Sequence, residues 1–575
     1  MTPLHGAIGM KPMSRPLDVL VVGAGPTGLT MACELRHYGL SCRIVDQADA
    51  PSGIPKAVAV QPRTLEVFDI MGLDEEFVAN GCQVQGFNVY AGGQRLVHLT
   101  MDGMPTRYSY MLTLPQSETE RLLTKRLSDL GVEVERSVQF ANVAQQEDGI
   151  TATLRHADAT TDTVQARWLI GCDGAHSAVR KAVGLPFEGT RYEESFLLAY
   201  VRIEERAPVD EARAFFTPDG PVGLLPLPQG RHYLIIPLLK ETAETDRTTV
   251  SLDELKTFLA QRGMAGLRIL EAFWITKFRI HRRIVPSLRV GRVFLCGDAA
   301  HIHSPAGGQG MNLGIQDAFN LAWKLALVTS GVAKPRLLDS YHAERHPIAS
   351  ETLIGTDLAT RVITLRSPLA QAVRNQVAMF MSSLDVVQHR LAQALSGLVR
   401  NYRKTPMVGE YHRGFLGVVT GVHATAEPPG FSEWRKFVAA PAAGDRAPDG
   451  NLSVRGTGVP VRLFELLRPG RHVLLLFAGR GTTPASYRKL EEIEQGVRAR
   501  YRDLIAVHLV VPQAAPTAAL RWDGSRLLDA EGELHRQYGA GSGCLYLIRP
   551  DGYVGYRSQP ADAGRLSAYL QTMFI

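Results

Sequence analysis

The stretch Leu17-Asp18-Val19-Leu20-Val21-Val22-Gly23-Ala24-Gly25-Pro26-Thr27-Gly28 is a short apolar run followed by closely spaced glycines. The run is rich in β-branched residues, which favours a strand, and the amphipathic residues that follow through Arg36 predict a helix. A second apolar run, 41–45, ends in Asp46, about 20 residues beyond the glycines. This order of strand, glycine turn, helix and second strand with a terminal acid predicts a dinucleotide-binding unit.

Each residue of this motif has a mechanical reason. Gly23 makes the tight turn, Gly25 lets the backbone approach a pyrophosphate, and Gly28 lets the helix pack closely. The helix N-terminus offers free N–H groups to the phosphate, and Asp46 can accept hydrogen bonds from a ribose diol. A purely structural glycine turn is the alternative interpretation. The motif alone does not distinguish NAD from FAD.

Composition sets the class of protein. The 575 residues predict about three or four folding units, and a 45% hydrophobic and 21% charged chain is globular rather than disordered. The net charge of +6 has no block of like charges, so no nucleic-acid partner is expected. The sequence contains no apolar run long enough for a membrane span, and no signal peptide is expected. The six cysteines form no CxxC pair and no metal-ligand cluster, which favours a cytoplasmic protein without a metal site.

Two further motifs follow apolar strands far downstream. The first is 168–180, which contains Asp173 and Gly174; the second is 292–312, which contains Gly297 and Asp298 and a glycine-rich stretch ending at Asn312. Read alone, each is an acid beside glycine at a strand end, for which a turn is the simple explanation.

Taken together and in this order, the three motifs resemble the FAD-dependent single-component aromatic hydroxylases, the group that includes para-hydroxybenzoate hydroxylase, phenol hydroxylase and pentachlorophenol monooxygenase. The resemblance implies that Gly23, Gly25, Gly28 and Asp46 bind the ADP half of FAD. It implies that Asp173 and Gly174 serve both FAD and the nicotinamide cofactor, and that Gly297 and Asp298 contact the ribityl chain and pyrophosphate. The backbone of Met311 and Asn312 would contact the flavin pyrimidine ring, and Pro305 would lie near the substrate. A helix starting near Asn312 would direct its positive end at the flavin N1 and O2, which stabilises an anionic reduced ring.

Smaller matches add FAD contacts by the same resemblance. Gln116 and Arg121 correspond to family residues that face FAD, and Ser117 with Glu120 predicts a capping box at the start of their helix. Lys56 stands where relatives usually have Arg, and a point charge lacks the bidentate fork of a guanidinium. Asp46 stands where Glu is commoner.

His301 and His303 flank the flavin loop. Imidazole titrates near neutral pH, so either side chain is a candidate proton carrier for activating a phenol. The alternative is that each histidine only hydrogen-bonds the loop backbone.

The predicted fold class is α/β, with a Rossmann-like FAD-binding domain interleaved with a substrate-binding β-sheet. We expect a flexible leader (1–16), the first part of the FAD domain (17–190), the substrate sheet (191–283), the second part of the FAD domain with a helical region (284–402), and a linker (403–443). Residues 444–575 resemble the thioredoxin-like C-terminal domain of the phenol hydroxylase branch but lack its redox CxxC. We therefore expect a structural role, for example at a subunit interface, and not disulfide exchange. A homodimer is an expectation from the family.

The resemblance implies an enzyme that uses NAD(P)H to reduce FAD and molecular oxygen to form a C4a-hydroperoxyflavin, which hydroxylates a small phenolic substrate. The alternative acceptor is a polyketide, antibiotic or quinone-like compound. A different class, a binding protein that works through its thioredoxin-like domain, is disfavoured by the presence of all the acidic and glycine motifs.

Overall fold

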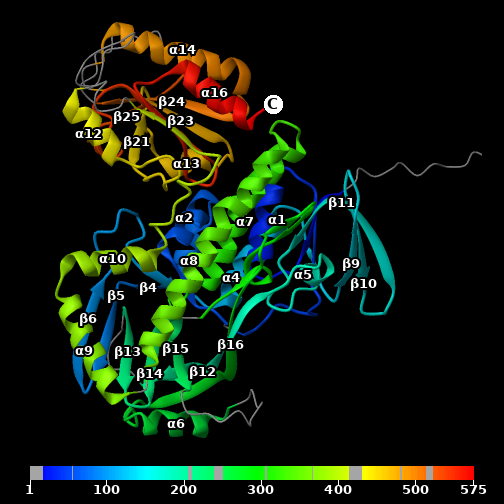
Figure 1. The fold of residues 1–575 in the computed structure, drawn as a ribbon, viewed down its shortest axis with the longest axis vertical. Helices are drawn as coiled ribbons and strands as arrows, with labels where there is room; N and C mark the ends of the chain where they lie inside the picture. Colours follow the sequence, from blue (N-terminus) through cyan, green and yellow to red (C-terminus); the bar gives the residue numbers. More distant parts are fainter. Residues whose placement is uncertain are drawn as a thin grey trace, which may run out of the picture.

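The computed structural model describes residues 17–54, 56–204, 210–238, 250–304, 307–365, 367–412, 430–479, 482–512, 522 and 524–575. The predicted leader, 1–16, lies outside these residues. The residues in these ranges form three eight-stranded sheets and one three-stranded sheet. In Figure 1 the C-terminal unit lies at the top, the glycine-motif unit in the centre and the middle sheet at the bottom.

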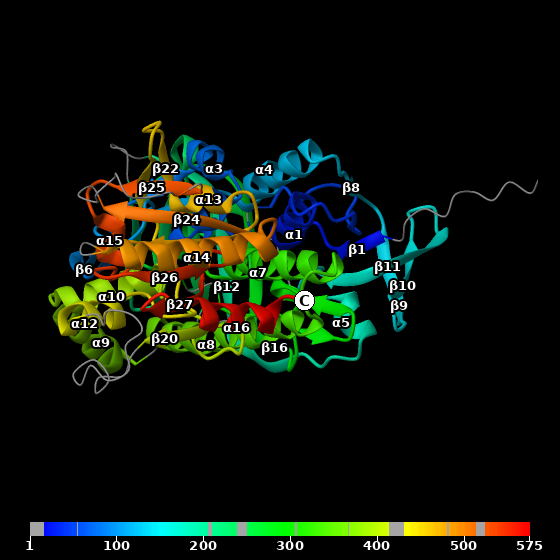
Figure 2. The same cartoon turned by 90° about the horizontal axis from the view of Figure 1, so that it is seen from above.

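The first sheet is built on the strand that precedes the glycines. Its strand order is β17-β18-β11-β1-β2-β8, and β11 also pairs with the β9–β10 hairpin. The bounds are β1 (Leu17–Val22), β2 (Cys42–Val45), β8 (Val134–Glu135), β9 (Gln139–Gln145), β10 (Ile150–Arg155), β11 (Thr161–Gly171), β17 (Arg289–Val290) and β18 (Val293–Leu295). Strands β18, β11, β1 and β2 are parallel, so their carboxyl ends meet at one edge. The hairpin and the start of β11 extend away from the body (Figure 2).

Helices cover this sheet and extend toward the other units. They are α1 (Pro26–His37), α2 (Pro62–Ile70), α3 (Asp74–Asn80), α4 (Gln116–Asp129), α5 (Ala178–Ala182), α7 (Gly310–Thr329) and α8 (Asp339–Ile363). Helix α1 packs against α7 and α4. Short 3-10 turns are η1 (Pro228–Gly230), η2 (Gly297–Ala299) and η3 (Pro335–Leu338), and the small sheet joins β3 (Ala59–Val60), β7 (Met111–Thr113) and β4 (Cys82–Val84).

The middle sheet draws on more of the chain than 191–283. Its order is β19-β16-β12-β15-β14-β13-β5-β6. The bounds are β5 (Gly86–Ala91), β6 (Gln94–Thr100), β12 (Glu188–Ile203), β13 (Glu211–Thr217), β14 (Gly220–Leu227), β15 (Arg231–Leu238), β16 (Ile269–Ile284) and β19 (His301–Ile302), with α6 (Leu252–Gln261), α9 (Pro368–Ser382) and α10 (Asp385–Ser396) beside them. Strands β5 and β6 lie within 17–190, the predicted first part of the FAD domain. They join the middle sheet because β5 pairs in parallel with β13, which is distant in the sequence.

The C-terminal unit has the strand order β20-β27-β26-β23-β24-β25-β21-β22. The bounds are β20 (Gly409–His412), β21 (Asn451–Val454), β22 (Pro460–Arg462), β23 (His472–Phe477), β24 (Ile505–Pro512), β25 (Ser525–Asp529), β26 (Cys544–Ile548) and β27 (Val554–Gln559), with α12 (Phe431–Ala439), α13 (Leu463–Leu467), α14 (Pro484–Tyr501), α15 (Glu533–Gln537) and α16 (Ala563–Met573). Strands β23 and β24 pair in parallel, and β26 and β27 continue the sheet from β23 as antiparallel neighbours. The thioredoxin-like character of this unit stays a prediction. Strand β20 lies in the predicted linker and pairs with β27.

Buried ion pairs join the C-terminal unit to the central one. Arg549 donates to both carboxylate oxygens of Glu344 in α8, at 2.7 and 2.8 Å. Arg462 contacts Asp69 in α2 at 2.7 Å. Because each of these carboxylates is fully enclosed, the two units share one interior. The predicted α/β fold class is confirmed, and no helix among the described residues has the length and apolarity needed to cross a bilayer.

Candidate functional site

All the sequence motifs meet at one edge of the first sheet. The glycine turn follows β1, Asp46 follows β2, Asp173 follows β11, and the Gly297–Asp298 turn follows β18 after Cys296. These strands are parallel neighbours, so their carboxyl ends bring together residues that are far apart in the sequence. In open α/β sheets ligands bind outside the carboxyl ends of the strands. This edge is therefore the candidate site.

The glycine turn leaves room only on its outer side. A Cβ on Gly23, which has a φ of +101°, would lie 2.4 Å from the Cys172 carbonyl oxygen, and one on Gly28 would lie 1.9 Å from the Gly23 carbonyl oxygen. Gly25, in contrast, has nothing within 4 Å of such an atom. Two glycines are thus fixed by internal packing, and the third faces open space beside the N-terminus of α1. This is the geometry expected for close backbone approach by a phosphate.

Asp46 closes the turn from the second strand. One carboxylate oxygen accepts from the Ala24 N–H at 2.6 Å, and the other accepts from the Ala48 N–H at 2.8 Å. Arg136 lies 3.9 Å from the carboxylate. These bonds hold the acid against the glycine turn, and each oxygen keeps a second lone pair for a ligand. Its contact with a ribose remains a prediction.

Asp173 caps α5. Its carboxylate accepts from the Ser177 hydroxyl at 2.6 Å and from the Ala178 and Val179 N–H groups at 2.6 and 3.1 Å. Burial raises the pKa of this carboxyl, and the hydrogen bonds oppose the rise. Gly174 has a φ of +75°, a conformation that favours glycine. The motif therefore builds a tight turn, and its contacts with FAD and the nicotinamide cofactor remain predictions.

Asp298 follows Gly297 in the turn after β18, and its side chain is exposed. Desolvation by surrounding protein raises the pKa of its carboxyl, while His301 and Lys56 act to lower it. The turn therefore presents a solvent-accessible carboxylate at the sheet edge, with the exposed Lys56 within electrostatic range.

The N-terminal part of α7 packs against the Gly297–Asp298 turn. A Cβ on Gly314 would come within 2.2 Å of the Thr27 hydroxyl oxygen of α1 and 3.2 Å of the Gly297 Cα, so α1, α7 and η2 pack without spacing side chains. The first intrahelical bond of α7 runs from Leu313 N–H to the Gln309 carbonyl. The N–H groups before it, including that of Met311, have no intrahelical acceptor.

Asn312 fixes this helix end to the preceding loop. Its side chain accepts from the Gln61 N–H at 2.9 Å and donates to the carbonyls of Ala59 and Gly308 at 2.8 and 2.7 Å. The side chain is fully buried. The free N–H groups of α7 are therefore held in place, as the predicted flavin contact requires.

The helix that carries Gln116 and Arg121 begins differently from the prediction. Pro115 is the N-cap of α4, and no side chain caps the helix. Ser117 lies inside the first turn, and Glu120 accepts instead from the Gln116 amide at 2.8 Å. The capping-box prediction is wrong because the proline fixes an earlier start. Arg121 pairs with Glu118 at 2.8 Å on the exposed surface of α4.

The two histidines have different partners. His301 is buried, and its Nε2 lies 2.8 Å from Asp317. His303 donates through Nδ1 to the Ser304 carbonyl at 2.8 Å, and burial lowers its pKa to about 4, so its ring is neutral at pH 7. His303 thus has the backbone bond foreseen as the alternative, and its Nε2 is a buried acceptor. Pro305 lies outside the described residues.

Sequence reasoning missed the charged pair behind the site. Asp317 accepts from the Gly297 N–H, from His301 and from Arg345 of α8, at 3.1, 2.8 and 2.7 Å. Both Asp317 and Arg345 are buried. In the sequence, Asp317 is a carboxylate within an otherwise apolar helical run, and this could have marked it. Its partners could not be identified from the spacing of residues along the chain.

An aromatic row on the middle sheet faces the same region. Tyr200 lies directly opposite Tyr233 on one neighbouring strand and Trp274 on the other, so the three share one face. Val58, from the loop after β2, packs in the same apolar cluster, and the Tyr233 hydroxyl donates to the Lys56 carbonyl at 3.2 Å. The row therefore contacts the loop that carries Lys56.

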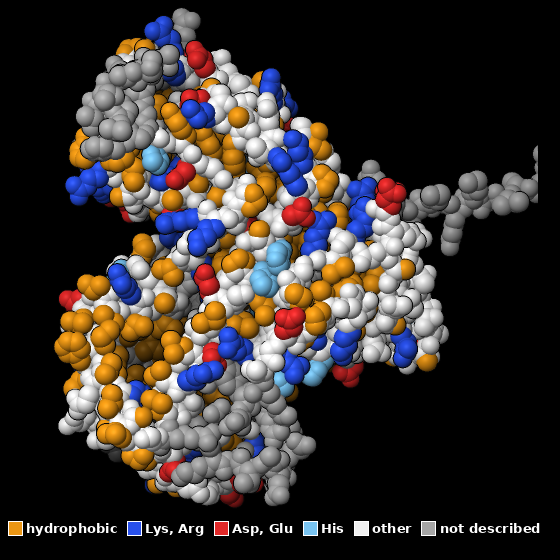
Figure 3. Space-filling model, in the orientation of Figure 1, with side chains coloured by type: hydrophobic (Ala, Val, Ile, Leu, Met, Phe, Trp, Pro, Cys, Tyr) orange, Lys and Arg blue, Asp and Glu red, His pale blue; other side chains and the backbone are white. Residues whose placement is uncertain are grey.

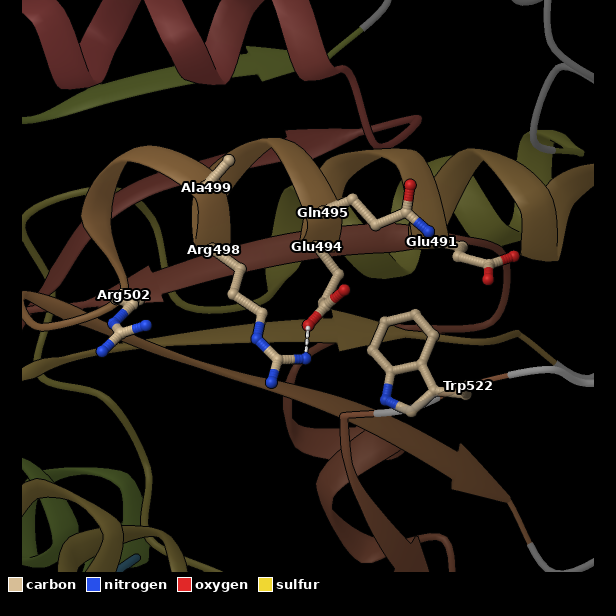
Figure 4. Close-up of a pocket in the computed structure, with 7 residues that line it drawn as sticks. All are labelled: Glu491, Glu494, Gln495, Arg498, Ala499, Arg502 and Trp522. Carbon is tan, nitrogen blue, oxygen red and sulfur yellow. Dashed lines mark ion pairs between the residues drawn. The ribbon is translucent and has the colours of Figure 1, made fainter.

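A separate pocket of about 370 Å³ lies on the C-terminal unit (Figure 4). Its lining residues are Glu491, Glu494, Gln495, Arg498, Ala499, Arg502 and Trp522. Glu494 and Arg498 pair at 3.5 Å inside it. It shares no residue with the candidate site.

The residues at the sheet edge fit FAD. The open face of Gly25 offers a cradle for phosphate, and the N–H groups at the start of α7 offer donors for a polar ring edge. The exposed Asp298 carboxylate offers an acceptor for hydroxyls. FAD contains all three groups, at the separated positions of an extended dinucleotide.

Comparisons with known proteins agree with this geometry. The family model for an FAD binding domain matches residues 16–355, and that for the aromatic-ring hydroxylase C-terminal domain matches 440–574. The chain is 33% identical to the 6-methylpretetramide 4-monooxygenase of Streptomyces rimosus, over 98% of this chain and 95% of that protein. It is 33% identical to the pentachlorophenol 4-monooxygenase of Sphingobium chlorophenolicum, over 95% and 94%.

A solved structure gives the same result over the whole chain. The OxyS anhydrotetracycline hydroxylase from Streptomyces rimosus superposes with a TM-score of 0.73 at 28% identity, covering 97% of this chain and 99% of that one. The match includes both the motif-bearing sheet and the C-terminal unit. The chain therefore belongs to the FAD-dependent aromatic-ring hydroxylases, and it is a flavoprotein monooxygenase.

Proposed function

We propose that this monooxygenase hydroxylates a phenolic ring of a polycyclic compound, with NAD(P)H as reductant. The observation that carries the proposal is the aromatic row Tyr200–Tyr233–Trp274 beside the flavin-binding edge. Aromatic side chains offer a wide apolar face for stacking a fused ring system. Two relatives that match almost the whole chain are named for pretetramide and anhydrotetracycline substrates, which supports this substrate class.

The proposed reaction replaces a ring C–H bond by a C–OH group. One oxygen atom of O₂ enters a ring C–H bond and gives C–O–H, and the other leaves as water. NAD(P)H and one proton supply the two electrons and the remaining hydrogen atoms. Bound FAD supplies the electron transfer and the activation of dioxygen.

The chain's own residues would bind the cofactor, orient the substrate ring and shield it from water. Gly25 and the start of α1 would hold the pyrophosphate, Asp298 a ribityl hydroxyl, and the N–H groups of Met311 and Asn312 the polar edge of the flavin ring. Lys56 adds a positive charge beside Asp298. These contacts would place the flavin beside the aromatic row, whose apolar surface would shield a stacked substrate ring from water.

The proton of the phenol needs an acceptor on the substrate side. We propose His303 Nε2, which is buried, has no protein partner among the described residues and belongs to a ring that is neutral at pH 7. Its ring lies beside Gly310, the first residue of α7. His301 and Pro305 remain the other candidates at this loop.

A simple phenol is the second candidate substrate. The pentachlorophenol 4-monooxygenase matches this chain as fully, and at the same identity, as the pretetramide enzyme. Nothing in the aromatic row prevents a single ring from binding, so the two classes must be compared directly.

We also propose that the enzyme works in the cytoplasm as a homodimer through α9. Leu369, Val373, Val377 and Phe380 form an apolar stripe at helical spacing, exposed by 76, 55, 53 and 67%. Figure 3 shows hydrophobic side chains gathering on this face. The charged residue of the helix, Arg374, lies over the Phe216 ring 4.0 Å away, so the stripe carries no charge that would oppose a second copy.

The dimer is tested by light scattering. Val373→Glu places a charge in the stripe and is expected to give monomers where the unmodified chain gives dimers. Arg390→Glu on α10, an exposed position outside the stripe, is the matched charge control. A monomeric unmodified chain at micromolar concentration would contradict the proposal.

The catalytic proposal is tested by following NAD(P)H consumption and peroxide release in parallel. The panel contains simple phenols, hydroxybenzoates and polycyclic phenols. A polycyclic phenol that accelerates consumption without matching peroxide is the expected result. Such coupling with simple phenols alone would support the second candidate, and consumption balanced by peroxide throughout would mean that no tested compound is a substrate.

A further inference from the structure

The turn that bears Asp298 is held from behind by a buried carboxylate. Asp317 lies in α7, is 1% exposed, and its Oδ2 accepts from both the Gly297 N–H at 3.1 Å and His301 Nε2 at 2.8 Å. Its Oδ1 accepts from Arg345 Nε at 2.7 Å. The acid thus joins one end of the Gly297–Asp298 turn and the strand that follows it to a single point on α7.

The charge state of this acid is fixed by its neighbours. Burial acts to raise the pKa of Asp317, but Arg345 and His301 together bring it below its usual range. Arg345 is itself anchored by Tyr402 and by the Leu313 carbonyl, both at 3.2 Å. Asp317 is therefore an ionised carboxylate, which can only accept hydrogen bonds.

This fixes the tautomer of His301. Since an ionised carboxylate only accepts, the ring nitrogen facing it, Nε2, must carry hydrogen. In the neutral ring Nδ1 is then an acceptor, and it has no hydrogen-bond partner among the described residues although it is buried. An unpartnered buried acceptor requires a donor from water or from a ligand.

We infer that Asp317 is a positioning residue of the FAD site: it holds the Gly297–Asp298 turn and keeps His301 as the Nε2–H tautomer. Gly297 has a φ of +60°, and its Cα lies against Gly314 of the same helix that carries Asp317. Without the bond to Gly297 the turn loses its anchor on α7, and Asp298 loses its fixed place. The inference rests on the FAD site described above.

The test compares two buried carboxylates in the full-length chain. Asp317→Asn keeps the size of the side chain but offers an amide N–H to groups that need an acceptor. Asp69→Asn is the matched control, since Asp69 is also enclosed and bound by Arg462, Arg468 and Tyr108, but at the C-terminal interface. Both variants should lower thermal stability, and Asp317→Asn alone should weaken FAD binding, by about tenfold or more.

A second measurement reads the tautomer of His301 directly. Nitrogen-15 NMR of labelled histidine in the unmodified protein should show His301 with hydrogen on Nε2, assigned by the loss of its signal in His301→Gln. In Asp317→Asn the hydrogen should move to Nδ1, because the amide now donates to Nε2.

The outcomes separate this inference from the proposed function. Hydrogen on Nδ1 in the unmodified protein, or FAD affinity in Asp317→Asn within threefold of that of Asp69→Asn, would overturn the positioning role. FAD affinity is measured without any aromatic substrate. A failure of every phenol to be hydroxylated would therefore contradict the proposed substrate and leave the positioning role standing.

Discussion

Replacing Glu344 by Gln should release the C-terminal unit from the rest of the protein. Glu344 accepts hydrogen bonds from the two terminal guanidinium nitrogens of Arg549 and from the Lys324 ammonium, at 2.7–2.8 Å. Its side chain has no exposed area. Asp551 is the other carboxylate of the cluster and also pairs with Arg549. Two cations and two anions are thus enclosed together, and their charges cancel.

The size of the effect follows from this balance. The amide leaves one uncompensated positive charge inside the protein, and breaking a buried pair in this way costs about 3–5 kcal/mol. At about 2–4 °C per kcal/mol for units of 150–250 residues, the melting temperature should fall by about 10 °C. Burial also lowers the pKa of Lys324 to about 8, against the pull of Glu344, so the unpaired lysine can shed its proton and relieve part of this cost.

The assay is thermal unfolding at pH 7, with limited proteolysis to follow separation of the C-terminal unit. Glu351→Gln is the control, because Glu351 lies exposed on the same helix. Adding Lys324→Met to Glu344→Gln removes the surplus charge and should restore much of the stability. A fall of less than about 2 °C, or a double variant less stable than Glu344→Gln, would refute this reasoning.

Three further predictions concern the cofactor edge. Gly28→Ala should purify with little FAD, measured by the flavin absorbance ratio, because its Cβ would lie 1.9 Å from the Gly23 carbonyl oxygen; normal flavin content would show that the turn can yield. Asp298→Ala should raise the FAD dissociation constant about tenfold or more in a fluorescence titration, and an unchanged constant would remove Asp298 from the site. The pKa of His303 falls to about 4 in the folded protein, so the unfolded chain binds the extra proton first as pH drops below about 6.5. The free energy of unfolding should therefore fall between pH 6.5 and pH 4. In denaturant titrations, the His303→Gln variant should lose about 1–2 kcal/mol less of it by pH 5 than the unmodified protein. Equal falls in the two proteins would contradict the buried neutral ring.

The sequence determined the elements whose reasons are local. Gly23 and Gly28 are required by backbone contacts within one strand-turn-helix unit, so their pattern is visible in the chain itself. The apolar runs predicted the strands before Gly23, Asp173 and Gly297. The family resemblance then indicated FAD, and the comparisons confirm it. The helix that carries Gln116 begins two positions earlier than the capping pattern predicted, with Pro115 and not Ser117 as its N-cap.

Only the tertiary structure decided which distant residues meet. Asp317 acts on Gly297 across 20 residues, and Arg446 binds Glu66 across 380, yet neither pair has a spacing that a pattern could reveal. The parallel addition of β5 to β13 is of the same kind. Local backbone geometry is set by the residues that adopt it. A buried charge, in contrast, is satisfied by whichever partner the packing of helices and sheets brings within reach, and that choice belongs to the fold as a whole.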